Sequence, residues 1–272
     1  MNRTNSSAMY AEVHHVEKLS PDVLRVVLTG GTLDRFEGSS ATDAYVNARF
    51  PPAGSPVTVP FSQGDLDEVA ADLRPRPRRF TIRHWAPEEQ KLSIDFVAHG
   101  DAGYAGSWAQ RAEPGDRLQF EGPGGSYRPS HDVDWHLLVG DESAIGAIGA
   151  SLQSLEPGAR ALVFAVVERR GYEIELPTAG DVAIQWLYRE DVADAETWVA
   201  DAIAVADFPL GTFDVFVHGE AGEVRAVRRH LAVDRGLDLA DASISPYWRR
   251  RHTDEDWRKV KRRWMADQAQ DA

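Results

Sequence analysis

The chain has 272 residues, 43% of them hydrophobic, so it can form one large domain or two of ordinary size with a proper core. Its 43 acidic and 30 basic residues give a net charge of −13, which argues against broad nucleic-acid binding because phosphates require dense Lys and Arg. The absence of cysteine excludes disulfides, thiolate catalysis and Cys-ligated iron–sulfur clusters, so redox chemistry would need a bound organic cofactor.

The start of the chain and its apolar runs predict a soluble, cytoplasmic protein. Residues 1–8 are polar and lack the hydrophobic core of a signal peptide. The longest apolar run, 161–167, is far shorter than a membrane-spanning helix. The nine histidines show no metal-binding constellation, since neither His14 with His15 nor His131 with His136 has an evident third ligand. We therefore expect no membrane insertion and no intrinsic metal.

Residues 10–127 have the pattern of an antiparallel barrel. Short runs of alternating apolar and polar residues are typical of half-buried strands, and Gly, Pro and Asp turn residues separate them. The expected strands are 11–16, 24–29, 45–50, 79–84, 92–97 and 117–121. Six such strands without a long helix predict a small closed barrel.

From residue 133 the pattern changes to alternating strands and helices, which predicts a parallel sheet. The expected strands are 135–139, 161–167, 182–188 and 213–217, and the expected helices are 144–155, 197–206 and 221–234. The first strand runs into Gly140, but Gly140, Gly146 and Gly149 do not match the G-x-G-x-x-G dinucleotide fingerprint. Glycine spacing alone therefore does not identify a nucleotide site here.

The C-terminal segment 246–272 is expected to be an extension that contains a helix. Thr253 and Asp256 resemble a capping box, and Trp257, Val260 and Trp264 share one helix face. That face should pack on the body of the protein or on a second subunit. Eight Lys or Arg against five Asp or Glu make the segment locally basic, which fits either a salt-bridged surface helix or a rim that concentrates an anionic substrate.

The stretch from Arg78 to Trp108 carries the strongest candidate site. Its first strand places guanidinium and hydroxyl groups at the expected outward positions. Small residues follow His99, and they let backbone amides approach a ligand closely in what we expect to be an open turn. Two fixed cations beside such a turn suit a phosphate or a pyrophosphate.

These residues resemble the siderophore-interacting protein family, FAD-dependent ferric-siderophore reductases of the ferredoxin-reductase superfamily. The resemblance rests on Arg-x-Phe-Thr-x-Arg at 78–83 and on His-Gly with Gly-x-Ala-x-Ser-Trp-Ala at 99–109. It continues in the family's order through 114–116, 122–125, 140–143, 219–231 and 247–249.

The resemblance implies a two-domain β + α/β fold, like that of ferredoxin–NADP reductase. An antiparallel six-stranded Greek-key barrel at 10–127 would bind FAD, and a Rossmann-like parallel-sheet domain at 133–245 would bind NAD(P)H. A helical tail would follow at 246–272. The long connection 52–77 would then either lie over or beside the flavin or be an ordinary surface insertion, with an acidic piece of helical character at 66–73.

Residue roles follow from the same resemblance. Arg78, Thr81 and Arg83 would hold the flavin phosphates and ribityl chain, and Phe80, a tyrosine in most members, would lie against the flavin ring. The pyrophosphate and adenine side would be lined by His99, Gly103, Ala105, Ser107 and Trp108. Tyr104 stands where proline is usual in the family.

In the second domain the resemblance implies nicotinamide contacts at Asp141, Glu142, Ser143 and Ala144. A helix begins there, so its amides and dipole are suited to a cofactor phosphate; the competing hypothesis is that Asp141 or Ser143 caps the helix while Glu142 repels phosphate. Arg169 and Arg170 either accept the 2′-phosphate of NADPH or are solvated loop charges. Trp248 would shield the flavin or form a wall of the substrate cleft.

The implied activity is the transfer of electrons from NADH or NADPH, or from ferredoxin, through FAD to an Fe(III) siderophore. Reduction releases the metal because hard oxygen donors hold Fe(II) less tightly than Fe(III). No side-chain acid or nucleophile is needed as a catalytic group. Two alternatives stay open: a flavin oxidoreductase of the same superfamily with another acceptor, and a flavin-containing module that binds a siderophore or partner without turnover.

Overall fold

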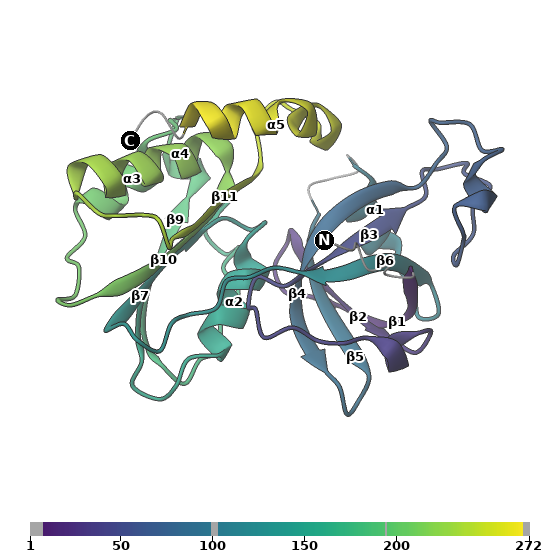
Figure 1. The fold of residues 1–272 in the computed structure, drawn as a ribbon, viewed down its shortest axis with the longest axis horizontal. Helices are drawn as coiled ribbons and strands as arrows, with labels where there is room; N and C mark the ends of the chain where they lie inside the picture. The colour runs from purple at the N-terminus through teal and green to yellow at the C-terminus, as the bar shows by residue number, and fades with distance from the viewer. Residues whose placement is uncertain (1–7, 99–102, 194, 269–272) are drawn as a thin grey trace. The chain divides into compact units, whose positions relative to one another are not determined.

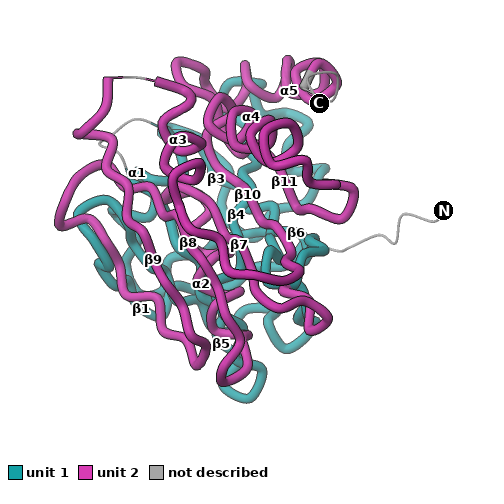
Figure 2. The backbone as a smooth tube through the Cα atoms, turned by 90° about the vertical axis from the view of Figure 1, so that its left-hand side faces the viewer, with its two compact units in different colours: residues 1–128 teal, residues 129–272 magenta. Residues whose placement is uncertain are grey.

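The computed structural model describes residues 8–98, 103–193 and 195–268. The chain divides into two compact units, Met1–Arg128 and Pro129–Ala272, which Figure 2 shows in different colours. Each unit has its own hydrophobic core, and each is described by itself below.

The first unit is a closed antiparallel barrel of six strands in the order β1-β2-β5-β4-β3-β6 (Figure 1), which confirms the expected barrel. The strands are β1 (Met9–Lys18), β2 (Val23–Thr29), β3 (Tyr45–Phe50), β4 (Arg76–Ala86), β5 (Lys91–Val97) and β6 (Arg117–Gly124). Each expected strand is present. Closure pairs the first strand with the last, so the barrel presents no unpaired edge to other chains.

The barrel core follows from strict alternation along the strands. In β3 the side chains of Val46, Ala48 and Phe50 are buried while the residues between them are half-buried. Strand β5 repeats the pattern, with Leu92 and Phe96 fully buried. A period of two places these residues on one face, and closing the sheet brings those faces together in the core.

Residues 104–111, expected to be part of an open turn, form the helix α1 (Tyr104–Arg111) instead. Ala105 and Ala109 of this helix are buried in the barrel core. A Cβ atom at Gly106 would lie 2.9 Å from the carbonyl oxygen of Val97, so the backbones of α1 and β5 approach closely there. The small residues therefore serve helix–strand packing as well as any ligand contact.

The long connection between β3 and β4 contains the short 3-10 helix η2 (Gly64–Leu66), and residues 67–75 form turns rather than the expected helical piece. Another 3-10 helix, η1 (Leu33–Arg35), follows β2. The side chain of Gln119 fixes the connection to the barrel. Its Oε1 accepts from the Phe61 N–H at 2.8 Å, and its Nε2 donates to the Phe61 carbonyl at 2.9 Å.

The second unit is a five-stranded parallel sheet in the order β11-β10-β7-β8-β9. Its strands are β7 (Trp135–Gly140), β8 (Arg160–Val167), β9 (Asp181–Tyr188), β10 (Phe213–Glu220) and β11 (Ser243–Trp248). Strand β11 was not predicted, and it crosses residue 245, where the sequence-based division ended the α/β domain. Pro246 at its centre breaks the usual sequence signal of a strand.

Helices α3 and α4 cover one face of this sheet, and α2 lies on the other (Figure 1). The helices are α2 (Ile145–Gln153), α3 (Trp198–Ala204), α4 (Ala221–Arg229) and α5 (Asp254–Gln268); η3 (Arg189–Asp191) is a 3-10 helix, and η4 (His230–Asp234) continues α4 as a π-helix. No helix among the described residues is long and apolar enough to cross a membrane.

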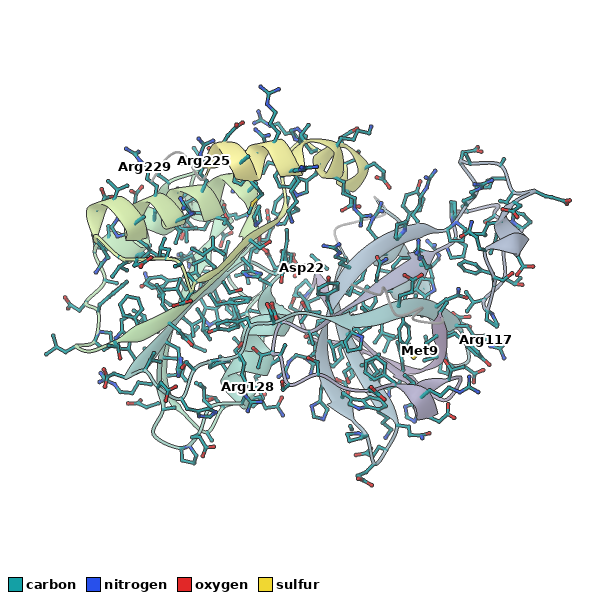
Figure 3. The ribbon with its side chains drawn as sticks, in the orientation of Figure 1. Met9, Asp22, Arg117, Arg128, Arg225 and Arg229 are labelled. Atoms are coloured by element: carbon teal, nitrogen blue, oxygen red, sulfur yellow. The ribbon has the colours of Figure 1, made fainter. Side chains whose placement is uncertain are left out.

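The C-terminal helix α5 begins with the expected capping box. Thr253 Oγ1 accepts from the Asp256 N–H at 3.1 Å and donates to Asp256 Oδ2 at 2.8 Å. Trp257 is 2% exposed, and Arg225 of α4, labelled in Figure 3, places its guanidinium carbon 5.8 Å from the ring centroid of Trp264. The expected packing face is thus present on the body of the unit, except that Val260 is 40% exposed.

Candidate functional site

The first turn of α1 and the guanidinium of Arg78 lie close together in the barrel unit. Gly103 precedes α1 with φ +95°, and no side chain among the described residues caps this helix end. The first amides of a helix have no partner within the helix. The guanidinium carbon of Arg78 lies 5.5 Å from the ring centroid of Tyr104, the first residue of α1. A cation lying on the side chain of the first residue of a helix, and amides at that helix end, are both features that suit an anion.

An aromatic cluster adjoins this position. Phe80 packs on Phe96 with 4.4 Å between ring centroids, and Trp108 of α1 lies 5.7 Å from the same ring. Both also contact Phe50. Phe80 and Trp108 are themselves only partly buried. The structure thus brings two predicted flavin-contact residues together, because both pack on Phe50 and Phe96.

Strand pairing decides which way the predicted residues of β4 point. Arg78 pairs with Ala48 and Phe80 with Val46, and both partners are fully buried. Directly opposed residues share one face of a sheet, so Arg78 and Phe80 point to the inner side of the barrel wall. Thr81 pairs with Tyr45 and lies on the other face. The structure therefore separates Thr81 from Arg78 and Phe80.

Arg83 is buried rather than outward, which corrects the expectation from alternation. The register of β4 with β5 shifts between Ile82 and His84, and this irregularity leaves Arg83 only 6% exposed. Burial lowers the pKa of Arg83, and the cation of Arg25 lowers it further. Arg25 itself makes a two-pronged ion pair with the buried Asp95, at 2.7 and 2.9 Å.

The remaining barrel candidates lie on or beside α1. Ala105 and Ser107 are buried in the helix, and Gly103 precedes it. His99 lies outside the described residues.

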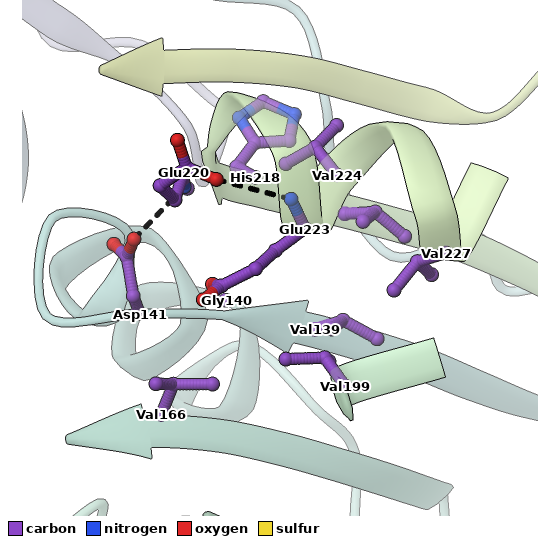
Figure 4. A pocket seen from close by; sticks show the side chains of 12 residues that line it. Val139, Gly140, Asp141, Val166, Val199, His218, Glu220, Glu223, Val224 and Val227 are labelled. Carbon is purple, nitrogen blue, oxygen red and sulfur yellow. Dashed lines mark hydrogen bonds between the residues drawn. The ribbon is translucent and has the colours of Figure 1, made fainter. Parts of the chain in front are cut away.

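In the second unit, a small cavity lined mostly by buried side chains lies where β7 and β10 end (Figure 4). Strands β8 and β9 extend the sheet on one side of β7, and the chain then returns to place β10 on the other side. Ligands of open α/β sheets bind outside the carboxyl ends of the strands at such a reversal. The polar residues that line the pocket are Asp141, His218, Glu220 and Glu223.

Asp141 joins the ends of three strands. Its Oδ2 accepts from the Glu220 N–H at 2.9 Å and from the Trp248 indole at 2.7 Å, while its Oδ1 accepts from the Ser143 N–H at 2.9 Å. A Cβ atom at Gly219 would lie 2.8 Å from Oδ2, and Gly219 has φ +145°. Glycine is therefore required for this close approach of β10 to Asp141.

Glu142 is buried beside Arg189, which follows β9. Both Glu142 carboxylate oxygens accept from Arg189 Nη1, at 2.6 and 2.7 Å. Burial raises the pKa of Glu142 to about 7, although the Arg189 cation acts in the opposite direction. Burial alone would lower the pKa of Arg189, but the carboxylates of Glu142 and Asp141 outweigh it and raise that pKa.

Glu220 and Glu223 complete a buried acidic group that sequence reasoning missed. Glu220 caps α4 by accepting from the amides of Gly222 and Glu223, at 2.7 and 3.1 Å. Glu223 accepts from the Trp198 indole at 2.9 Å and pairs with Arg250. Burial raises the pKa of Glu223 to about 7. The sequence singles out only the segment 219–231, with no role for its carboxylates, because their partners are remote in sequence.

The backbone amides of the turn before α2 donate hydrogen bonds within the turn itself. The Ser143 N–H goes to Asp141 Oδ1 and the Ala144 N–H to the Asp141 carbonyl, at 2.9 Å each. The structure thus brings Asp141, Glu142 and Trp248 into one network with Arg189. Ser143 and Ala144 serve the turn, and Asp141 binds this turn rather than capping α2, whose N-cap position is Ala144 and has no side-chain cap.

Two family models match the chain: the siderophore-interacting FAD-binding domain over residues 12–127 and the siderophore-interacting protein model over residues 133–251. The ferric vibriobactin reductase of Vibrio cholerae is 32% identical over 240 residues, which cover 87% of this chain and 88% of that protein. The chain belongs to the siderophore-interacting protein family.

Other relatives support the same family and fold. An uncharacterised protein of Mycobacterium tuberculosis is 37% identical over 266 residues, covering 92% of this chain and 93% of that protein. The NADPH-dependent ferric-chelate reductase of Escherichia coli is 28% identical over 246 residues, covering 87% and 91%. The crystal structure of a siderophore utilization protein from T. fusca matches with TM-score 0.79 and 30% identity, over 91% of this chain and 94% of that one. The predicted family and fold are therefore confirmed.

The residues of the barrel fit the FAD that its family domain binds. A dinucleotide needs its phosphates neutralised and its ring system packed. Arg78 and the amides at the start of α1, which no described side chain caps, could meet the first need, and the partly buried rings of Phe80 and Trp108 could meet the second.

Proposed function

We propose that this protein is an FAD-dependent ferric-siderophore reductase that takes electrons from NADH or NADPH and releases Fe(II) for iron acquisition. The observation that carries the proposal is the contact of Arg78 with the ring of Tyr104, the first residue of α1, near Phe80 and Trp108, which both pack on Phe96. The names of the V. cholerae and E. coli relatives support ferric-siderophore reduction and NADPH as a donor. Bound FAD supplies a carrier that accepts two electrons and passes them on singly.

The barrel residues hold the cofactor and need not react. We assign the phosphates to Arg78 and the α1 amides, and the flavin ring to the face of Phe80, with FAD on residues 10–127. Arg83 is buried beside the Arg25–Asp95 pair. We therefore assign Arg83 to shaping the barrel wall, and to contacting only those parts of the cofactor that enter the barrel. Thr81, Gly103, Ala105, Ser107, Trp108 and His99 remain proposed contacts on the basis of the family pattern.

We place the nicotinamide cofactor on residues 133–245, at the carboxyl ends of β7 and β10. The reversal of strand order at this edge of the sheet supports the placement. Asp141 and Glu142 are proposed to hold Trp248 and Arg189 at the rim of the site, since both carboxylates are already bonded to these groups. Ser143 and Ala144 shape the turn, and 246–272 supplies Trp248 and α5.

The iron complex is the substrate, and no resident metal is proposed. Among the described residues, no group of His, Cys, Asp and Glu could hold a metal ion. Reduction weakens the complex because oxygen donors prefer the harder Fe(III). Ferredoxin is a second proposed electron donor. We place the reaction in the cytoplasm, where NADH and NADPH are produced.

An anaerobic titration of the purified, FAD-loaded protein tests this function. NADH and NADPH should each be tried as the reductant that bleaches the flavin absorbance, and a ferric hydroxamate or catecholate should then restore it. A control with ferredoxin in place of nicotinamide separates the donors. Flavin that is reduced but reoxidised only by free flavin or a quinone would favour the flavin oxidoreductase alternative, and a protein that no donor reduces would favour a binding module.

A further inference from the structure

We infer that this protein prefers NADH to NADPH. Asp191 and Glu190 are already paired with Arg170, the side chain that a 2′-phosphate would need. The inference rests on the proposed nicotinamide site in the second unit. It concerns the loop after β8 and the 3-10 helix η3 after β9, which lie together at the carboxyl edge of the sheet.

The position of this loop follows from the β7-α2-β8 unit. In such βαβ units the side chain that meets the adenosine ribose comes from the end of the second strand, where an acidic residue binds the 2′-hydroxyl or an arginine accepts a 2′-phosphate. Strand β8 ends at Val167 and is followed by Glu168, Arg169 and Arg170. By sequence alone, two arginines here are as compatible with NADPH as with solvated charges.

Arg170, whose side chain is 60% exposed, is paired with carboxylates. Its Nη1 and Nη2 donate to the two oxygens of Asp191 at 2.8 and 2.7 Å, and Nη1 also lies 3.3 Å from Glu190 Oε1. Its guanidinium carbon lies 4.4 Å from the ring centroid of Tyr188. A guanidinium paired with a carboxylate through two parallel bonds is already in the geometry that a phosphate would use.

The surrounding loop is held in the same arrangement. The backbone N–H of Arg170 donates to Glu190 at 2.9 Å, and the Glu190 N–H donates to the Glu168 carbonyl at 3.1 Å. Glu173 accepts from the Tyr188 hydroxyl and the Gly171 N–H, at 2.7 Å each. These bonds hold the loop after β8 against η3, next to Asp191 and the guanidinium of Arg170.

The balance of charge opposes a phosphate. Glu168, Glu173, Glu190 and Asp191 supply four carboxylates to these two loops, against Arg169 and Arg170, while Arg189 turns to Glu142. A 2′-phosphate carries a charge of about −1.5 to −2 and would have to displace Asp191 to reach Arg170. The 2′- and 3′-hydroxyls of NADH instead donate to carboxylates, which are acceptors only.

Calorimetry with the adenine halves of the two cofactors tests the inference without turnover. ADP-ribose and 2′-phospho-ADP-ribose differ only in the phosphate at issue, and the full-length, FAD-loaded protein is used at low salt. We expect ADP-ribose to bind the wild type about tenfold more tightly, since like charges near the phosphate are poorly screened there. Asp191→Asn should reduce that ratio at least about fivefold by releasing Arg170.

Two further variants locate the effect. Adding Arg170→Ala to Asp191→Asn should cancel the gain for the phosphorylated ligand. Asp181→Asn removes the same charge from the amino end of β9, where the side chain is exposed, and should leave the ratio unchanged.

Tighter binding of 2′-phospho-ADP-ribose by the wild type would overturn the inference, as would a ratio that Asp191→Asn does not change. In either case the binding of nucleotide would still support the proposed nicotinamide site. Binding of neither ligand, with FAD in place, would remove that site from the proposed function and the inference with it.

Discussion

The indole Nε1 of Trp248 donates a 2.7 Å hydrogen bond to Oδ2 of Asp141, an oxygen that also accepts from the backbone of Glu220. One carboxylate oxygen thereby joins the last residues of β11 and β10 to the residue that follows β7. Asp141 is 1% exposed. Buried donors that lose a partner are costly, so the shape of the pocket edge depends on this one side chain.

A double-mutant cycle on this contact should show coupling. Asp141→Ala is expected to lower the free energy of unfolding by about 2–3 kcal/mol because it leaves buried donors without an acceptor, and Trp248→Phe by about 1 kcal/mol. The double variant should lose less than the sum of the two, as urea denaturation can measure. Strict additivity would show that the two side chains do not stabilise each other.

Arg78→Ala should weaken FAD binding by roughly 10- to 100-fold, since a charge-assisted contact contributes about 1.5–3 kcal/mol. Fluorescence titration of the apoprotein with FAD measures the change. Arg79→Ala is the matched control, because Arg79 is exposed and lies over the Tyr45 ring. If Arg79→Ala weakens FAD binding and Arg78→Ala does not, the assignment of the phosphate site is wrong.

The stability of the protein should fall as pH rises from about 4.5 to 7, and Glu142 should account for part of the fall. Its pKa is raised from 4.5 to about 7, chiefly by burial. Below pH 4.5 Glu142 is protonated in both states, and between these values the unfolded chain loses the proton first. The slope contributed by one such group is at most about 1.4 kcal/mol per pH unit.

Glu142→Gln should therefore make the pH profile of the unfolding free energy shallower over this interval. Glu175→Gln, at an exposed position, serves as the control and should leave the profile unchanged. Glu223 contributes a slope of the same sign, since its pKa is also raised to about 7. Burial lowers the pKa of His218 to about 3, so this residue makes the folded state more stable as pH rises. The effect of His218 has the opposite sign, but it is the same in the wild type and in both variants, so it cancels in the comparison. Identical slopes for wild type and Glu142→Gln would contradict the prediction.

Trp257→Ala should destabilise the second unit by about 3–5 kcal/mol, because it empties a fully enclosed site between α5 and the body of the unit. Val260→Ala, on the same helix but 40% exposed, should change the free energy of unfolding by less than about 1 kcal/mol. Thermal unfolding of the two variants measures the difference. Similar losses for both would mean that α5 is held by its charges rather than by Trp257.

Most of the fold was predicted from the alternation of apolar and polar residues and from apolar runs. The prediction failed where a proline or a shift of register interrupted the regular strand pattern. Alternation located the six barrel strands, and apolar runs located four strands of the parallel sheet. Strand β11 was missed because Pro246 interrupts it and its residues are polar or aromatic rather than aliphatic. Arg83 was placed outward because a sequence does not reveal a shift of register, such as the one between Ile82 and His84.

The candidate site likewise has one part that the sequence predicts and one part that only the structure shows. Motif order was enough to identify the family and to single out Arg78, Phe80 and Trp108, which do lie together. The network of Asp141 with Glu220 and Trp248 joins residues 79 and 107 positions apart, and no spacing rule links them. Likewise, the pairing of Arg170 with Asp191 depends on the 3-10 turn after β9, which carries no sequence signature.

The proline at the centre of β11 has a consequence for how copies of this protein behave in solution. Strand β11 is an outer strand of its sheet, with β10 as its neighbour. An outer strand with an unbroken row of amides is a template for intermolecular pairing, and aggregation can begin there. Pro246 has no N–H to donate, so the row of amide donors along β11 is interrupted at its centre and the strand is a poorer template for the sheet of another molecule.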